Sequence, residues 1–166
     1  MGLVPLGGNP MYLEIFAKRL KDLMEMEEES NRALSIKINV ARKSVRGWLT
    51  GKFFPKYNAL IKLSAHFKVS VDYLVGLEDV MDGNGHFSED IEISKADISK
   101  NLTSLLNEYM SNHNKTHYAM AKSLDIDQKA FSKWFKNGSV PEVITLIKIS
   151  RLMTVPMYTL LGGKEQ

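Results

Sequence analysis

The chain has 166 residues, of which 44% are hydrophobic and 25% charged, with a formal net charge of +3 and no cysteine. This composition is typical of a globular protein with one domain or two small ones. The absence of cysteine excludes disulfides and thiolate metal sites and fits a reducing compartment, so we expect a cytoplasmic protein. The longest uncharged stretches fall short of the ~20 apolar residues of a membrane span, so no membrane partner is expected.

The chain begins with MGLVPLGGNP, which is rich in glycine and proline. It lacks the basic region and the long apolar core of a secretory signal. We therefore expect residues 1–10 to be a flexible arm or a non-native remnant.

An internal repeat covers most of the remaining chain. When the sequence is shifted by 86 residues without gaps, many positions match, among them Trp48 with Trp134 and Pro55 with Pro141. Most of the matched residues are apolar or small, so the repeated feature is a hydrophobic core.

The two copies predict one domain at 11–78 and a second at 95–166. The stretch between them, LEDVMDGNGHFSEDIEIS, has six acidic residues, no Lys or Arg, and a Gly-Asn-Gly turn signal. We interpret residues 79–94 as an acidic linker. The alternative is a short structured segment that packs on a domain, because Ile91 and Ile93 alternate with polar residues.

Each copy has the hydrophobic periodicity of helices and no run that predicts a strand. Phe16 and Leu20 stand at helical spacing, and Ser30 is a candidate N-cap for the next short helix. Asn39 and its counterpart Asp125 tolerate positive φ, so they predict a tight turn with a left-handed residue in each copy. The predicted fold is all-α, with two tandem five-helix domains joined by the linker.

Two short helices joined by a tight turn form a helix-turn-helix. In the first copy we predict the second helix of this unit over 41–49. Ala41, Val45 and Trp48 then face the core. The residues left on or beside the outward face are Arg42, Lys43, Ser44, Arg46 and Gly47.

Residues 30–76 resemble the lambda repressor-like (Cro/XRE-type) DNA-binding domain. The W-x-x-G-K-x-x-P pattern at 48–55 and the sequence VSVDYLVG at 69–76 carry this resemblance. The second copy, at 116–162, is similar but looser, with WFKNGSVP and VPMYTLLGG in the same places. The usual glycine of the turn is replaced by Asn or Asp, which is a mild departure because both tolerate the conformation.

The resemblance implies that the helix at 41–49 lies in the major groove of DNA. The charge pattern supports this independently, because Ser30–Val71 contains nine Lys and Arg and no acid in a chain with 19 acids. An acid in this block would lie against a polyanion, whereas arginine can read guanine. The expected DNA contacts of the first copy are Asn31, Arg32, Arg42, Lys43, Ser44, Arg46, Gly47 and Lys52. Lys37 and Lys56 are expected to neutralise flanking phosphates together with Arg32 and Lys52.

The second copy allows two interpretations. Its helix at 127–136 would present a second DNA-binding surface, with contacts from His117, Gln128, Lys129, Ser132 and Lys133. Asp125 and Asp127 interrupt the acid-free pattern, however. The alternative is a copy that serves dimerisation or binds a protein partner, as in an antitoxin or an anti-repressor.

The expected function is sequence-specific regulation of transcription, as a repressor of prokaryotic or phage type that binds double-stranded DNA. The four histidines do not form a metal-binding pattern, and no nucleophile, base and acid occur at a readable spacing, so no enzyme activity, metal or cofactor is expected. Phe53 and Phe54 follow the predicted recognition helix in a loop, and we expect at least one of them to be exposed.

Overall fold

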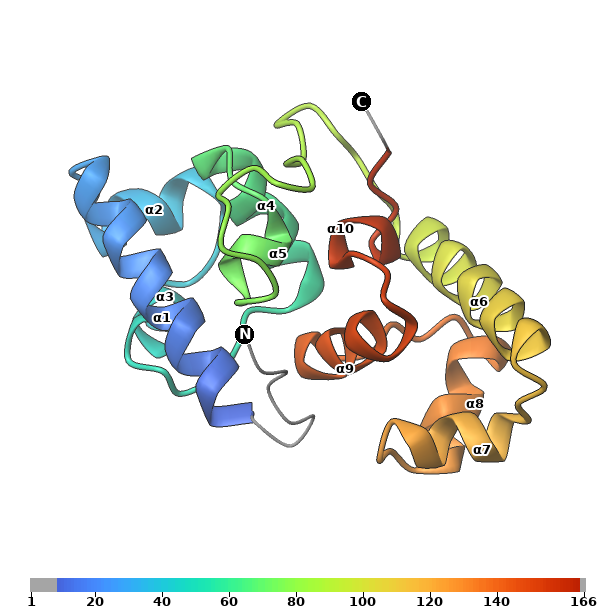
Figure 1. Cartoon of the computed structure of the whole chain (residues 1–166). Coiled ribbons are helices and arrows are strands. Elements are labelled where there is room, and N and C mark those ends of the chain that lie inside the picture. Colours follow the sequence, from blue (N-terminus) through green and yellow to red (C-terminus); the bar gives the residue numbers. More distant parts are fainter. Residues whose placement is uncertain (1–8, 165–166) are drawn as a thin grey trace. The chain divides into compact units, whose positions relative to one another are not determined.

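The computed structural model describes residues 9–164, and within this range the protein consists of ten α-helices and no strands (Figure 1). The all-α prediction is confirmed. The chain divides into two compact units between Asp90 and Ile91, each with five helices. The helices of unit 1 are α1 (Asn9–Met26), α2 (Asn31–Lys37), α3 (Arg42–Leu49), α4 (Tyr57–Phe67) and α5 (Val71–Leu74). Those of unit 2 are α6 (Lys95–Asn112), α7 (His117–Ser123), α8 (Gln128–Lys136), α9 (Val143–Met153) and α10 (Met157–Leu160).

The two units repeat the same order of elements. Helices α6, α7, α9 and α10 begin and end 86 residues after α1, α2, α4 and α5, and α8 begins 86 residues after α3. The left-handed positions recur as well, with φ of 55° at Asn39 and 53° at Asp125. The sequence repeat is therefore also a repeat of local backbone conformation, and the predicted left-handed turns are confirmed.

Each unit has its own core, built from the apolar side of its long first helix. In unit 1, α1 packs against α3 and α5 (Figure 1). Phe16, Leu20 and Trp48 are buried there. In unit 2, α6 packs against α8 and α10, and Leu106 and Trp134 are buried. Burying these large side chains removes apolar surface from water, which is the main favourable term in folding a domain of this size.

Residues 79–90, which we expected to be linker, belong to unit 1. Phe87 is 1% exposed, and its backbone N–H donates to Ser64 Oγ at 3.2 Å. The Glu78 carboxylate accepts hydrogen bonds from Ser70 Oγ and from Asn84 Nδ2, the latter at 2.8 Å. Residues 79–90 thus pack on unit 1, but not through the two isoleucines on which the packing alternative was based. Ile91 is 40% exposed, Ile93 is half-buried, and both precede α6 in unit 2.

The arm expected over residues 1–10 lies largely outside the described residues, and residues 9 and 10 begin α1. Among the described helices, none combines the length and the apolar character that crossing a membrane requires. No group of three or more His, Asp or Glu side chains within residues 9–164 is placed to hold a metal ion.

Candidate nucleic-acid interface

Helices α2 and α3 are joined by a tight turn that local hydrogen bonds define. Ser30 Oγ accepts from the Ala33 N–H at 3.1 Å, so the predicted N-cap of α2 is confirmed. After α2, the left-handed Asn39 lets the Val40 N–H reach the Ser35 carbonyl at 2.9 Å. Ser35 is 5% exposed, and its small side chain lets the two helices approach closely.

One prediction about the core side of α3 is wrong. Ala41 is exposed and precedes the helix, with φ −68° and ψ 142°. A residue in this extended conformation does not share the side-chain direction of the helix that follows it. Val45 and Trp48, at 0% and 3% exposure, do hold α3 against the core as predicted.

The opposite side of α3 and the adjoining residues carry exposed cations without acidic partners. We call this set the α2–α3 cationic surface, and its members are Arg32, Arg42, Lys43, Arg46 and Lys52. Within residues 9–164, none of them lies within ion-pair distance of a carboxylate, whereas Lys18, Arg19 and Lys37 each do. Asn31 and Ser44, also predicted as contacts, are half-buried beside this surface.

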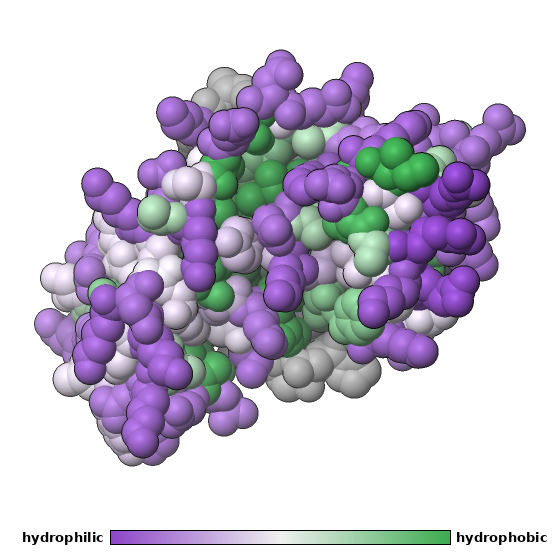
Figure 2. All heavy atoms as spheres, turned by 180° about the vertical axis from the view of Figure 1, so that it is seen from behind, coloured by the Kyte–Doolittle hydropathy of each residue, from purple (hydrophilic) through white to green (hydrophobic). Residues whose placement is uncertain are grey.

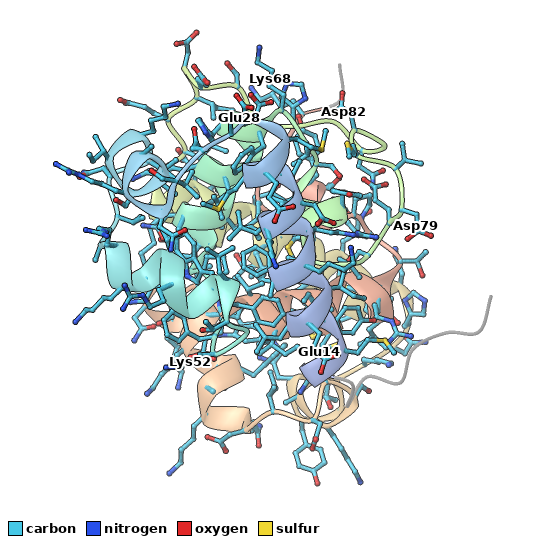
Figure 3. All side chains as sticks on the ribbon, turned by 90° about the vertical axis from the view of Figure 1, so that its left-hand side faces the viewer. Glu14, Glu28, Lys52, Lys68, Asp79 and Asp82 are labelled. Atoms are coloured by element: carbon cyan, nitrogen blue, oxygen red, sulfur yellow. The ribbon has the colours of Figure 1, made fainter. Side chains whose placement is uncertain are left out.

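Lys52 of the α2–α3 cationic surface lies apart from two carboxylates of the segment after α5. In Figure 3, Lys52 lies on the α3 side of α1, whereas Asp79 and Asp82 lie on the other side of α1. Figure 2 views the molecule from behind, and hydrophilic side chains cover its right-hand edge, where α2 and α3 lie. The exposed cations of the α2–α3 cationic surface, which have no acidic partner within residues 9–164, give this side a positive potential that would attract a polyanion.

Gly47 does not lie open beside the cations as expected. It is buried beneath the ring of Phe53, and a Cβ built on Gly47 would stand 2.2 Å from Phe53 Cζ. Phe53 is 47% exposed, which confirms that one of the two loop aromatics faces solvent. Phe54 is half-buried, with its ring 5.9 Å from that of Phe16.

The second unit presents a comparable helix pair with a different surface. The Ile126 N–H reaches the Ala121 carbonyl at 3.0 Å, as in the turn of the first unit. Along α8, the predicted contacts line an open hollow of about 370 Å³ together with Lys136. These lining residues are Gln128, Lys129, Ser132 and Lys133, all exposed except the half-buried serine.

Two features make this second surface less suited to a polyanion. The His117 ring packs on Phe135, with centroids 4.5 Å apart, and on Phe131 at 5.3 Å. Asp125 and Asp127 are exposed at the start of α8, and the Asp127 side chain makes no capping hydrogen bond. The structure therefore brings four of the predicted residues of unit 2 together along α8, whereas His117 does not line that hollow and exposed carboxylates lie next to it in the chain.

A charge cluster around the buried side chain of Glu29 in unit 1 has no signal in the sequence. The Glu29 side chain is 3% exposed and accepts hydrogen bonds from Lys37 Nζ and His66 Nε2, both at 2.8 Å. Burial, the largest influence, acts to raise the pKa of Glu29. The hydrogen bonds from Lys37 and His66 outweigh it, so this pKa lies below its ordinary value of 4.5. The cluster ties the end of α2 to α4. In unit 2, Lys115 and Ser123 stand at the positions of Glu29 and Lys37, 3.3 Å apart.

No protein-family model, curated protein or solved structure matches this chain.

Proposed function

We propose that the chain is a sequence-specific DNA-binding regulator of transcription, a repressor of prokaryotic or phage type. In this proposal both units are lambda repressor-like helix-turn-helix domains, and α3 is the recognition helix of unit 1. The observation that carries the proposal is the α2–α3 cationic surface, whose five exposed cations have no acidic partner within residues 9–164.

The cations of the α2–α3 cationic surface repel one another. Like charges on one surface raise the free energy of the folded unit, and a polyanion offsets that cost. Double-stranded DNA carries one charge per ~1.7 Å of its axis, and its major groove admits a helix. Arg42 is the first residue of α3 and Arg46 lies one turn later, so both guanidinium groups can reach base edges when the start of α3 enters the groove.

The test is alanine substitution on this surface. We expect Arg42→Ala and Arg46→Ala each to relax preference at one or two base pairs and to weaken specific binding by roughly 1–3 kcal/mol, or about 5- to 150-fold. Lys52→Ala should weaken all sequences alike and reduce the salt slope by about one phosphate contact. Selection of bound sequences and affinity measured at several salt concentrations report both effects.

Lys18→Ala is the matched control, because it removes the same charge from α1, where Lys18 already pairs with Asp22 at 2.9 Å. This variant should bind DNA as the wild type does. If Arg42→Ala and Arg46→Ala leave both the selected sequence and the affinity unchanged, α3 is not the recognition helix.

A second candidate function applies to unit 2 alone. The exposed carboxylates of Asp125 and Asp127 favour a protein partner or a second copy of the chain over DNA at this helix pair. In that case unit 1 binds DNA, and unit 2 brings two chains together or recruits another protein.

The stoichiometry on DNA distinguishes the two candidates. If both units bind DNA, one chain should occupy an asymmetric site, because the contact residues of α3 and α8 differ. If unit 2 dimerises, two chains should occupy a palindrome with half-sites ~34 Å apart. Sedimentation of the complex with a selected site gives the number of chains. Two chains on a palindrome, together with binding that is insensitive to Gln128→Ala and Lys129→Ala, would exclude DNA reading by unit 2.

A further inference from the structure

The burial of Gly47 is unusual for its position on α3. Lys43 lies one turn before it, Thr50 one turn after it and Arg46 beside it, and all three side chains are exposed. Gly47 therefore belongs to the outward side of the helix. It is nevertheless buried, because the ring of Phe53 covers it.

The loop after α3 holds this ring in place. Gly51, at φ 69°, turns the chain back, and the Lys52 N–H donates to the Gly47 carbonyl at 2.9 Å. A Cβ on Gly47 would stand 2.2, 2.5 and 2.9 Å from three ring carbons of Phe53. The ring thus occupies the space that a side chain at position 47 would occupy. Figure 3 shows Lys52, the residue before Phe53, beside α3.

We propose that Phe53 is a specificity-determining residue that contacts the 5-methyl group of a thymine in the major groove. The inference rests on the proposed function of α3. Phe53 is 47% exposed, and the exposed Lys43, Arg46 and Lys52 of the same helix and loop would face the DNA with it. The thymine methyl is the apolar group that the major groove offers, and phenylalanine is among the side chains that contact it. Contact removes both apolar surfaces from water.

The second unit lacks this arrangement and serves as an internal comparison. Lys133 stands at the position of Gly47, and Ser139 stands at that of Phe53. At this position α8 therefore has a lysine side chain of its own, whereas on α3 the space is filled by the ring of a loop residue. The methyl-sensitive thymine should therefore lie in the part of the DNA site that unit 1 covers.

The experiment uses the full chain and a DNA site selected by it. Each thymine is replaced in turn by deoxyuracil, which removes only the 5-methyl group, and the dissociation constant is measured each time. For the wild type we expect about a fourfold loss at one thymine, the ratio that ~0.8 kcal/mol per methyl-sized group corresponds to. Phe53→Ala should bind the thymine and deoxyuracil forms of that site equally well.

A folding control is needed because Phe53→Ala uncovers Gly47. The double variant Gly47→Ala/Phe53→Ala restores a side chain to α3, and alanine is a better helix former than glycine. It should melt at least as high as Phe53→Ala and should still lack the response to deoxyuracil. That result separates loss of the ring from loss of helix stability.

Two results would overturn the inference. One is a wild type for which no thymine methyl matters, and the other is a Phe53→Ala variant that keeps the wild-type response to deoxyuracil. If that variant also weakens binding to every sequence alike, the ring contacts the sugar instead of the methyl group. In both cases the effects of Arg42→Ala and Arg46→Ala still test the proposed function separately. A chain that selects no DNA sequence overturns both proposals.

Discussion

Replacing Trp48 by alanine should lower the stability of unit 1 by ~3–5 kcal/mol and leave the stability of unit 2 unchanged. Trp48 is 3% exposed on the side of α3 that packs against α1. A small domain has ~5–15 kcal/mol of total stability, so this loss is a large part of what holds unit 1 folded. Circular dichroism should show part of the helical content lost at a lower temperature than in the wild type. The fluorescence of the remaining Trp134 should still report the wild-type transition of unit 2.

The repeat supplies the reciprocal experiment. Trp134 is 6% exposed, with its ring centroid 5.0 Å from that of Phe131, so Trp134→Ala should destabilise unit 2 by a similar ~3–5 kcal/mol and leave Trp48 as the reporter of unit 1. Tyr118→Ala is the control, because Tyr118 is 60% exposed and its truncation should change stability by less than ~0.5 kcal/mol. A Trp48→Ala protein with native helical content and unchanged melting would show that this residue does not hold α3 to the core.

Replacing Glu29 by glutamine should produce the other large loss of stability, with a characteristic dependence on pH. Gln keeps the shape but loses the charge that accepts hydrogen bonds from His66 and Lys37. A hydrogen bond to a charged group contributes ~1.5–3 kcal/mol to stability, and the bond from His66 to the Glu29 carboxylate is of this kind. Unit 1 should therefore unfold at lower denaturant concentration in this variant.

The sign of the pH dependence follows from the lowered pKa of Glu29. A carboxyl whose pKa is lower in the folded state stabilises the fold above its ordinary value of 4.5, and this contribution is lost as the pH falls through the folded pKa. The difference in unfolding free energy between wild type and Glu29→Gln should be greatest above pH 4.5 and shrink at lower pH. Denaturant unfolding at a series of pH values measures it.

Glu14→Gln is the matched control for this experiment. Glu14 is an exposed carboxylate on α1, and Figure 3 shows it near the start of that helix. Its replacement should change stability little at any pH. A difference between Glu29→Gln and wild type that stays constant from neutral pH to below pH 4.5 would mean that the Glu29 charge does not stabilise unit 1.

Local features of the fold could be predicted because their causes lie within a few residues of one another. The N-cap Ser30 bonds to Ala33, three residues away, and Asn39 is a residue type that tolerates the φ of 55° it adopts. The spacing of Val45 and Trp48 predicts their common direction within one helix. The prediction that Ala41 faces the core is wrong because helical spacing applies only within the helix, and α3 begins at Arg42. Binding to DNA stays a prediction, drawn from charge and from resemblance.

The sequence by itself determined the repeat, the helices, the left-handed turns and the acid-free block over Ser30–Val71, because each is a pattern of neighbouring or regularly spaced residues. Only the tertiary structure decided which distant side chains meet. Phe87, in the predicted linker, is buried and bonds through its backbone N–H to Ser64 of α4. The Glu29 carboxylate accepts a hydrogen bond from His66, and the ring of Phe53 covers Gly47. Such contacts depend on how loops return to the core, and neither hydrophobic periodicity nor residue type encodes which partner a side chain reaches there.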